Sequence, residues 1–261
     1  MKVLFQKSWF NRSIIDCSFE KGHEGAYYAG YIDKMRLRGQ IGNFGWDPSK
    51  KVSTSWDIGV DDHTAIIWFQ TDGRNVYIID CYEKSGEGIP HYADIINSKP
   101  YSYDYHWAPH DIAVREWGSG LSRLEQARQL DLVFETKDNG ASSKLPALSF
   151  IDGINSARAM FAILWIDERN CSKLIRCLEN YRKAYDANGN ETGKAVHDAN
   201  SHYADSFRYM SISLSLTRRG QSTPEELERR YIEACNNGKK GHSIATVFNN
   251  QPLGPGNPFR M

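Results

Sequence analysis

The fold is decided by residues 52–83, VSTSWDIGVDDHTAIIWFQTDGRNVYIIDCYE, which contain three short β-rich runs separated by turns. The runs are VSTSWDIG, TAIIWFQ and NVYIIDCYE. Residues 71–74, TDGR, lie between the second and the third run and are typical of a hairpin turn. Each run has the length and the β-branched and aromatic content of a strand. The stretch therefore predicts three antiparallel strands that follow one another as a meander.

Helices and strands alternate after the meander. We expect a helix over 89–97, a strand over 103–111, a helix over 121–130 and a short strand over 131–136. A helix over 149–165, capped by Ser149 and Asp152, and a helix over 172–185 should follow. After a polar turn over 186–193, a last helix is expected to begin within 197–209. Three strands followed by this alternation predict an α/β fold with a mixed sheet flanked by helices.

The chain divides into three predicted parts. Residues 1–50 have little periodicity and are expected to be a lead-in or linker. Residues 51–217 hold the predicted sheet and helices, so they form the domain. Residues 218–261 begin with a capped helix and end in a tail rich in proline and glycine, which we expect to be flexible.

Composition limits the class of protein. With 261 residues, 40% hydrophobic and 25% charged, the chain is typical of a soluble globular protein. Its 32 basic and 32 acidic residues leave no global positive field, so any attraction for nucleic acid must come from a local patch. The five cysteines lack CxxC spacing and are expected to be reduced thiols. No apolar run is long enough for a membrane span or a signal peptide.

Three aspartates from distant segments are candidate metal ligands. Asp57 closes the first strand of the meander, Asp111 closes the fourth strand, and Asp205 lies on the late helix. Oxygen ligands on rigid elements are what a hard divalent cation needs. Two ions sharing such a site can activate a water and stabilise the leaving oxygen of a phosphodiester, which is nuclease chemistry. The alternative is that each aspartate is only a turn or cap residue.

Several further residues are candidates for supporting roles. His202 and Arg208 lie one turn before and after Asp205 and are expected on the same helix face. His202 is a candidate to orient a carboxylate or to contact phosphate, and a structural ion pair is an equal alternative for Arg208. His110 precedes Asp111 and is either a structural histidine or a partner of a metal ligand. A basic surface for DNA is expected, with ordinary solvated helix faces as the alternative, from Arg115, Arg123, Lys137 and Arg158.

Four segments together resemble a known family. They are DIGVDDHTAIIWFQ (57–70), PHDIAVREWGSGLSRLEQARQL (109–130), DGINSARAMF (152–161) and HDANSHYADSFRYM (197–210). In this order they are similar to the C-terminal nuclease domain of tailed-phage terminase large subunits. The resemblance implies a ribonuclease H-like fold and two-metal hydrolysis, with magnesium or manganese, of double-stranded viral DNA concatemers during packaging. Asp57, Asp111 and Asp205 would be the catalytic acids, and Asp62 an auxiliary ligand.

The resemblance also implies partners and shows departures. The expected partners are double-stranded DNA, the portal protein, the small terminase subunit and the ATPase domain of the same motor, in the host cell cytoplasm and without a membrane. Ser206 stands where an alanine is common in the family. No GxxxxGK[ST] phosphate loop occurs in the sequence, and residues 7–22 resemble the end of the ATPase and its linker.

Two other functions are compatible with the residues. DIGVDDHT (57–64) would hold phosphate and magnesium in an ATPase with the actin or sugar-kinase fold, although such proteins need a second lobe and glycine-rich loops. The other alternative is a non-catalytic module that docks on the portal protein.

Overall fold

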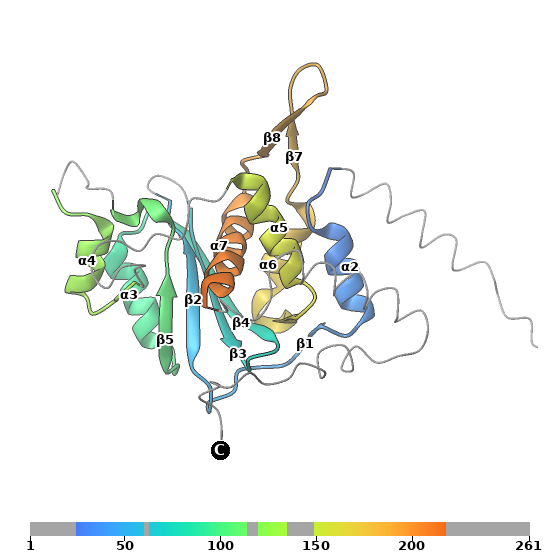
Figure 1. The fold of residues 1–261 in the computed structure, drawn as a ribbon. Coiled ribbons are helices and arrows are strands. Elements are labelled where there is room, and N and C mark those ends of the chain that lie inside the picture. The colour runs from blue at the N-terminus through green and yellow to red at the C-terminus, as the bar shows by residue number, and fades with distance from the viewer. Residues whose placement is uncertain (1–24, 60–62, 114–119, 135–148, 218–261) are drawn as a thin grey trace, which may run out of the picture.

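The computed structural model describes residues 25–59, 63–113, 120–134 and 149–217 (Figure 1). A six-stranded mixed sheet has the strand order β1-β6-β4-β3-β2-β5. Its strands are β1 (Ile41–Gly42), β2 (Val52–Asp57), β3 (His63–Thr71), β4 (Val76–Ser85), β5 (Tyr103–Trp107) and β6 (Leu164–Asp167). β2, β3 and β4 pair antiparallel in sequence order, while β5, β6 and β1 add parallel strands at the two sides. The predicted meander and the predicted mixed α/β fold are confirmed.

Helices cover both faces of the sheet. The described helices are α2 (Ala29–Leu37), α3 (Ile89–Ser98), α4 (Arg123–Gln129), α5 (Phe150–Met160), α6 (Glu168–Asn180), α7 (Ser201–Thr217) and the short 3-10 helix η1 (His110–Ala113). α3 and α4 pack with one hydrophobic core, and α2, α5, α6 and α7 pack with a second core on the opposite face. Within the described segments, no helix is both long and apolar enough to cross a bilayer.

The side chains of the central strand alternate between the two cores. Ile66 and Trp68 of β3 face the core beside α3 and α4, whereas Ala65, Ile67 and Phe69 face the core beside α7. Since both faces are covered, β3 is an almost continuous apolar run rather than an alternating one. The register pairs Asp57 with Ala65 and Ala65 with Glu83, so all three side chains project toward α7.

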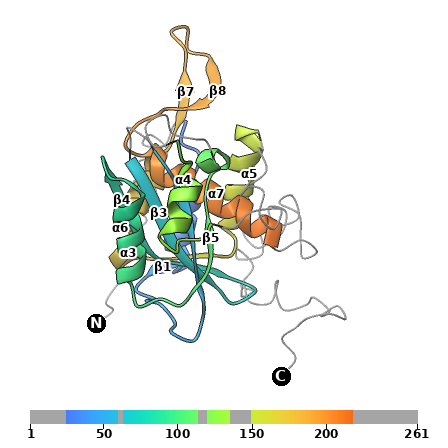
Figure 2. The ribbon, with the colours of Figure 1, turned by 90° about the vertical axis from the view of Figure 1, so that its left-hand side faces the viewer.

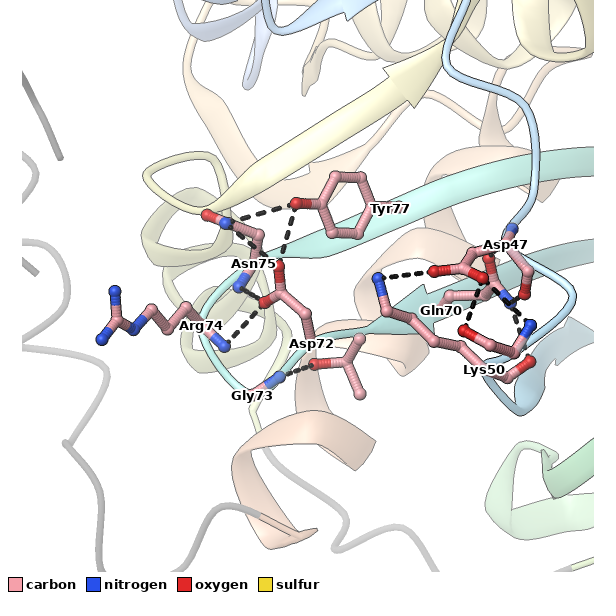
Figure 3. Close-up of polar contacts among 10 residues, drawn as sticks. Asp47, Lys50, Gln70, Asp72, Gly73, Arg74, Asn75 and Tyr77 are labelled. Carbon is pink, nitrogen blue, oxygen red and sulfur yellow. Dashed lines mark hydrogen bonds and ion pairs between the residues drawn. The ribbon is translucent and has the colours of Figure 1, made fainter. Parts of the chain in front are cut away.

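The predicted hairpin turn joins β3 to β4 (Figure 3). The Asp72 carboxylate accepts hydrogen bonds from the backbone N–H groups of Arg74 and Asn75, at 2.9 and 2.7 Å, and from the Tyr77 hydroxyl at 3.0 Å. Gly73 has a φ of 86°, which favours glycine. These contacts close the turn and fix the register of β3 against β4.

The segment before β2 is bound to the sheet by Gln70, a buried residue of β3 (Figure 3). Its side-chain oxygen accepts from the Asp47 N–H at 2.9 Å, and its nitrogen donates to the carbonyls of Asp47 and Lys50 at 2.8 and 2.9 Å. Earlier in the chain, Tyr28 and Ile32 are buried in the core beside α7. Residues 25–50 thus pack on the sheet, and the domain boundary at residue 51 stays a prediction.

Several predicted elements differ from the structure, including the strand predicted over 103–111, which ends as β5 at Trp107. The helix predicted over 149–165 is too long, because α5 ends at Met160 and β6 begins at Leu164. The apolar run across this junction is compatible with either a buried helix or a buried strand, which periodicity alone does not separate. In the described part of the strand predicted over 131–136, Phe134 makes only an isolated bridge to His106.

The polar turn predicted over 186–193 is the tip of a hairpin formed by β7 (Lys183–Tyr185) and β8 (Glu191–Ala195). Figures 1 and 2 both show this hairpin projecting beyond the sheet and its helices. α6 precedes it and ends at Asn180, earlier than the predicted residue 185. The predicted C-terminal helix and tail, 218–261, lie outside the described residues.

Candidate active site

Two serines fix α7 against β2. The Ser55 hydroxyl donates to the Ser206 carbonyl at 2.9 Å, and the Ser206 hydroxyl donates to the Ser55 carbonyl at 2.9 Å. Both residues are buried. This reciprocal pair sets the helix at one height along the strand, so Asp205, next to Ser206, lies near Asp57 at the end of β2. An alanine at position 206 could make only one of the two bonds.

Asp57 is largely withdrawn from water. Its side chain is 20% exposed, and its Oδ2 lies 3.4 Å from Nδ1 of His202, whose side chain is 6% exposed. Burial raises the pKa of Asp57 to about 6, and the negative charge of Asp205 acts in the same direction. The hydrogen bond and charge of His202, and the charge of Arg208, oppose this rise in pKa. The two carboxylates are therefore close enough to interact.

Asp205 is held from one side. The Tyr181 hydroxyl donates to its Oδ1 at 3.1 Å, and Nε and Nη2 of Arg208 donate to the same oxygen at 3.2 and 3.1 Å. Among the described residues, every hydrogen bond to the Asp205 side chain reaches Oδ1. Its Oδ2 keeps its lone pairs for a further partner, while the carboxylate as a whole is fixed in direction.

The Arg208 side chain lies across α5 at Gly153. A Cβ at position 153 would be 2.8 Å from Cδ of Arg208, closer than real contacts of this kind. The guanidinium also lies over the rings of Tyr209 and Phe150, at 4.6 and 5.7 Å from their centroids. Gly153 thus gives Arg208 the space to reach Asp205. A glycine inside a helical pattern is the sequence signal that could have indicated this close approach.

His63 and Glu83 join the same region and were missed from sequence. His63 begins β3 two residues before Ala65, and Glu83 is the β4 partner of Ala65, so both point toward α7. One potential ligand atom from each of His63, Glu83 and His202 lies within 4.8 Å of the others. Period-two alternation would have found them only with the strand register known.

The prediction that Asp111 closes the fourth strand is wrong, because β5 ends at Trp107 and Asp111 lies in the 3-10 helix η1 that follows. Its predicted role at the site is supported only by the position of its backbone. η1 follows β5, and β5 runs parallel to β2 with Ser55 opposite Trp107. The carboxyl ends of parallel strands meet at one edge of a sheet, so η1 lies at the edge that carries Asp57. The side chains of His110 and Asp111, and the whole of Asp62, lie outside what the structure describes.

The basic residues predicted to bind DNA are not all in one place. Nη1 of Arg123 is 3.5 Å from the carbonyl oxygen of Ile58, the residue after Asp57, which places Arg123 beside the site. Arg158 instead donates to the Tyr27 carbonyl at 3.4 Å and lies over the Tyr27 ring, on the α2 side of α5. Arg115 and Lys137 lie outside the described residues.

The start of α4 fixes the position of Arg123. Ser122 and Glu125 form a capping box, in which the Ser122 hydroxyl accepts from the Glu125 N–H and the Glu125 carboxylate accepts from the Ser122 N–H. Arg123 is the first residue of this helix, so its backbone is held by the cap. Its side chain reaches back over the end of β2.

Comparison with known proteins bears on the resemblance. No family model matches the chain. The terminase large subunit of Escherichia phage T5 is 27% identical over 190 residues, which cover 70% of this chain and 40% of that protein. The chain therefore spans less than half the length of this relative.

Solved structures are similar in fold. The large terminase of a thermophilic bacteriophage, in complex with ADP, aligns with a TM-score of 0.52 and 17% identity, over 70% of this chain and 44% of that one. The large terminase nuclease of thermophilic phage G20c, with bound magnesium, aligns with a TM-score of 0.48 and 17% identity, over 72% and 97%. The resemblance of this chain to terminase large subunits, and its ribonuclease H-like α/β fold, are thus confirmed.

Proposed function

We propose that this chain is a metal-dependent endonuclease that cuts double-stranded viral DNA concatemers during genome packaging. The observation that carries the proposal is the meeting of Asp57 and Asp205. They are separated by 148 positions in the sequence (205 minus 57), yet they lie close enough for the charge of one to raise the pKa of the other. His202 and Arg208 offset part of the repulsion between the two carboxylates, and a divalent cation bound between them would remove the rest.

The residues present fit a magnesium or manganese site. Asp57 and Asp205 offer carboxylate oxygens from a rigid strand and a rigid helix, and the proposed further ligands are Asp111 and the auxiliary Asp62. When bound, two ions activate a water and stabilise the leaving oxygen of the scissile phosphodiester.

The chain's own residues orient these ligands. His202 holds Asp57 through Nδ1, while Tyr181 and Arg208 hold Asp205 through one oxygen. Partners of this kind fix the direction of a ligand and are themselves needed for metal affinity. His202 and His110 are the proposed supporting histidines.

The sequence relative supports the biological setting. The chain is similar in sequence to a terminase large subunit. The proposed partners are therefore DNA, the portal protein, the small terminase subunit and the ATPase domain of the motor, and the proposed location is the host cytoplasm. Arg123 is the best-placed proposed DNA contact, because its side chain reaches the residue after Asp57. Arg115, Lys137 and Arg158 are the other proposed contacts.

Plasmid nicking tests the proposal. Supercoiled DNA is incubated with wild-type protein, Asp57→Asn or Asp205→Asn in magnesium and in manganese, and the nicked and linear products are measured on gels. Both variants should lose cutting with either metal. The control is Asp94→Asn, an exposed aspartate on α3, which should cut at the wild-type rate. Wild-type cutting by Asp57→Asn or Asp205→Asn would contradict the proposal.

DNA binding is tested separately. Arg123→Ala should weaken binding of duplex DNA in EDTA and should reduce the slope of log affinity against log salt by about 1, as expected for one lost phosphate contact. Arg128→Ala, an exposed arginine on the same helix, is the matched control and should bind more nearly as wild type. Equal loss in the two variants would argue against a specific role for Arg123. Binding to portal protein without any nicking would favour the docking module instead.

A further inference from the structure

A group of nitrogen and oxygen ligands lies next to the two aspartates. The His63–Glu83–His202 cluster draws one residue each from β3, β4 and α7, with potential ligand atoms within 4.8 Å of one another. The rings of His63 and His202 lie 5.2 Å apart between centroids, with planes tilted by 30°. Three elements distant in sequence thus bring two imidazoles and a carboxylate together, with His202 buried and His63 and Glu83 half-buried.

The carboxylate of Glu83 is buried, and its charge is compensated by a residue at the surface. The Glu83 side chain is only 2% exposed. The compensating charge is the Lys173 ammonium, 2.5 Å from Oε2 of Glu83, on a side chain that is 53% exposed. An exposed lysine can turn into solvent at little cost, so a cation within the cluster could take over the compensation of Glu83.

The contact between His202 and Asp57 bears on the tautomer of the imidazole. Nδ1 of His202 lies 3.4 Å from Oδ2 of Asp57, on one side of the ring. A proton on Nδ1 would be shared with Asp57, and Nε2 would then carry the lone pair that a metal needs. A carboxylate behind a histidine in this way is the usual arrangement around protein metal ions, since it fixes the tautomer and orients the ring.

The geometry points to a zinc-type site in the His63–Glu83–His202 cluster, separate from the magnesium or manganese site proposed at Asp57 and Asp205. Two imidazoles and one carboxylate suit Zn²⁺ or Co²⁺, whereas Mg²⁺ prefers oxygen ligands and water. Ligands at about 2.0–2.1 Å from the ion in a tetrahedral site are about 3.3 Å apart, and the three candidate ligand atoms, which lie within 4.8 Å of one another, need only small side-chain movements to reach that spacing. The bound ion would join α7 to the β3–β4 hairpin.

This inference does not rest on the proposed nuclease function. Zinc binding is assigned to His63, Glu83 and His202, whereas DNA cutting is assigned to the aspartates, and the two sites share only His202, which orients Asp57. The two can therefore fail independently, and Asp205→Asn separates them because it removes a proposed magnesium ligand and leaves the cluster intact.

Metal titration tests the site. Zn²⁺ is titrated calorimetrically into metal-free protein in the presence of excess Mg²⁺, and Co²⁺ binding is followed by its visible absorption, which becomes intense in tetrahedral sites. Wild-type protein should bind one Zn²⁺ under these conditions. His63→Ala should weaken Zn²⁺ binding by about 100-fold or more, since it removes a direct ligand. His91→Ala, at a histidine of α3 bonded to the Tyr82 hydroxyl, is the matched control and should bind as wild type.

Lys173→Gln gives a second measurement in the opposite direction. It removes the ammonium that competes with the ion for Glu83, so Zn²⁺ affinity should rise. Because the Lys173 side chain is exposed, the substitution leaves the buried core unchanged. Thermal melts of each metal-free variant check that it is folded. Asp205→Asn should keep zinc affinity while losing cutting.

Four results would overturn the inference. They are no Zn²⁺ binding by folded wild-type protein, unchanged affinity in folded His63→Ala, no gain in Lys173→Gln, or loss of zinc binding in Asp205→Asn. In each case the cluster would be an internal network of ion pairs and hydrogen bonds that supports Asp57.

Discussion

The buried Asp57 should make the stability of the metal-free protein depend on pH in a defined way. Its pKa is raised from an ordinary value of 3.8 to about 6, chiefly by burial. A carboxyl whose folded pKa is raised contributes its stability fully below the unfolded pKa, and that contribution is lost as pH rises through the folded pKa. At about 1.4 kcal/mol per pKa unit, charging Asp57 costs the folded state about 3 kcal/mol in total.

Asp57→Asn cannot charge, so it should escape this loss. Urea unfolding in EDTA, at about pH 5 and about pH 8, should show the stability of the variant rising relative to wild type by about 1.4 kcal/mol, because roughly half of the total lies between these pH values. The comparison across pH cancels the constant cost of replacing the carboxylate. Asp94→Asn, exposed on α3, should show no such rise. A stability difference that is the same at both pH values would refute a buried, destabilised Asp57.

Three further substitutions test how Asp205 is held. Gly153→Ala should reduce the nicking rate strongly, because the added Cβ displaces Arg208 from Asp205. The free energy of unfolding, measured in urea, should change less, because alanine gains about 0.5–1 kcal/mol of helix propensity over glycine. Tyr181→Phe should lower the free energy of unfolding by about 1 kcal/mol and weaken manganese binding, measured by calorimetry. Ser206→Ala should cost about 1 kcal/mol in urea unfolding with little change in nicking, since the reciprocal serine bond still locates the helix.

The elements that could be predicted from sequence are those with an unambiguous pattern or turn. The β3–β4 hairpin was found because Asp72 and Gly73 leave the chain few other conformations. β6 was missed because Leu164 and Ile166 are buried next to a helix of similar hydrophobicity, and only pairing with β4 makes them a strand. The core role of Tyr28 was also missed, because isolated apolar residues gain meaning only from tertiary packing.

The same distinction holds for the site. Asp57 and Asp205 were candidates because one ends a recognisable strand and the other lies on a recognisable helix, and the structure brings these two elements together. His63 and Glu83 were not found, because their proximity depends on a strand register that no local pattern states.

The site holds two aspartates of like charge on a rigid strand and a rigid helix. The burial of apolar side chains on the helix can offset the free-energy cost of these charges. Charging Asp57 costs about 3 kcal/mol. Phe207 and Met210, which follow Asp205 on α7, are fully buried, and burying such side chains contributes about 1.5–3 kcal/mol each. Two core residues of α7 thus match or exceed the cost of the acid that the helix faces. Together with the reciprocal Ser55–Ser206 hydrogen bonds, these buried side chains favour a docked α7, so the helix that carries Asp205 need not be ordered by the ion.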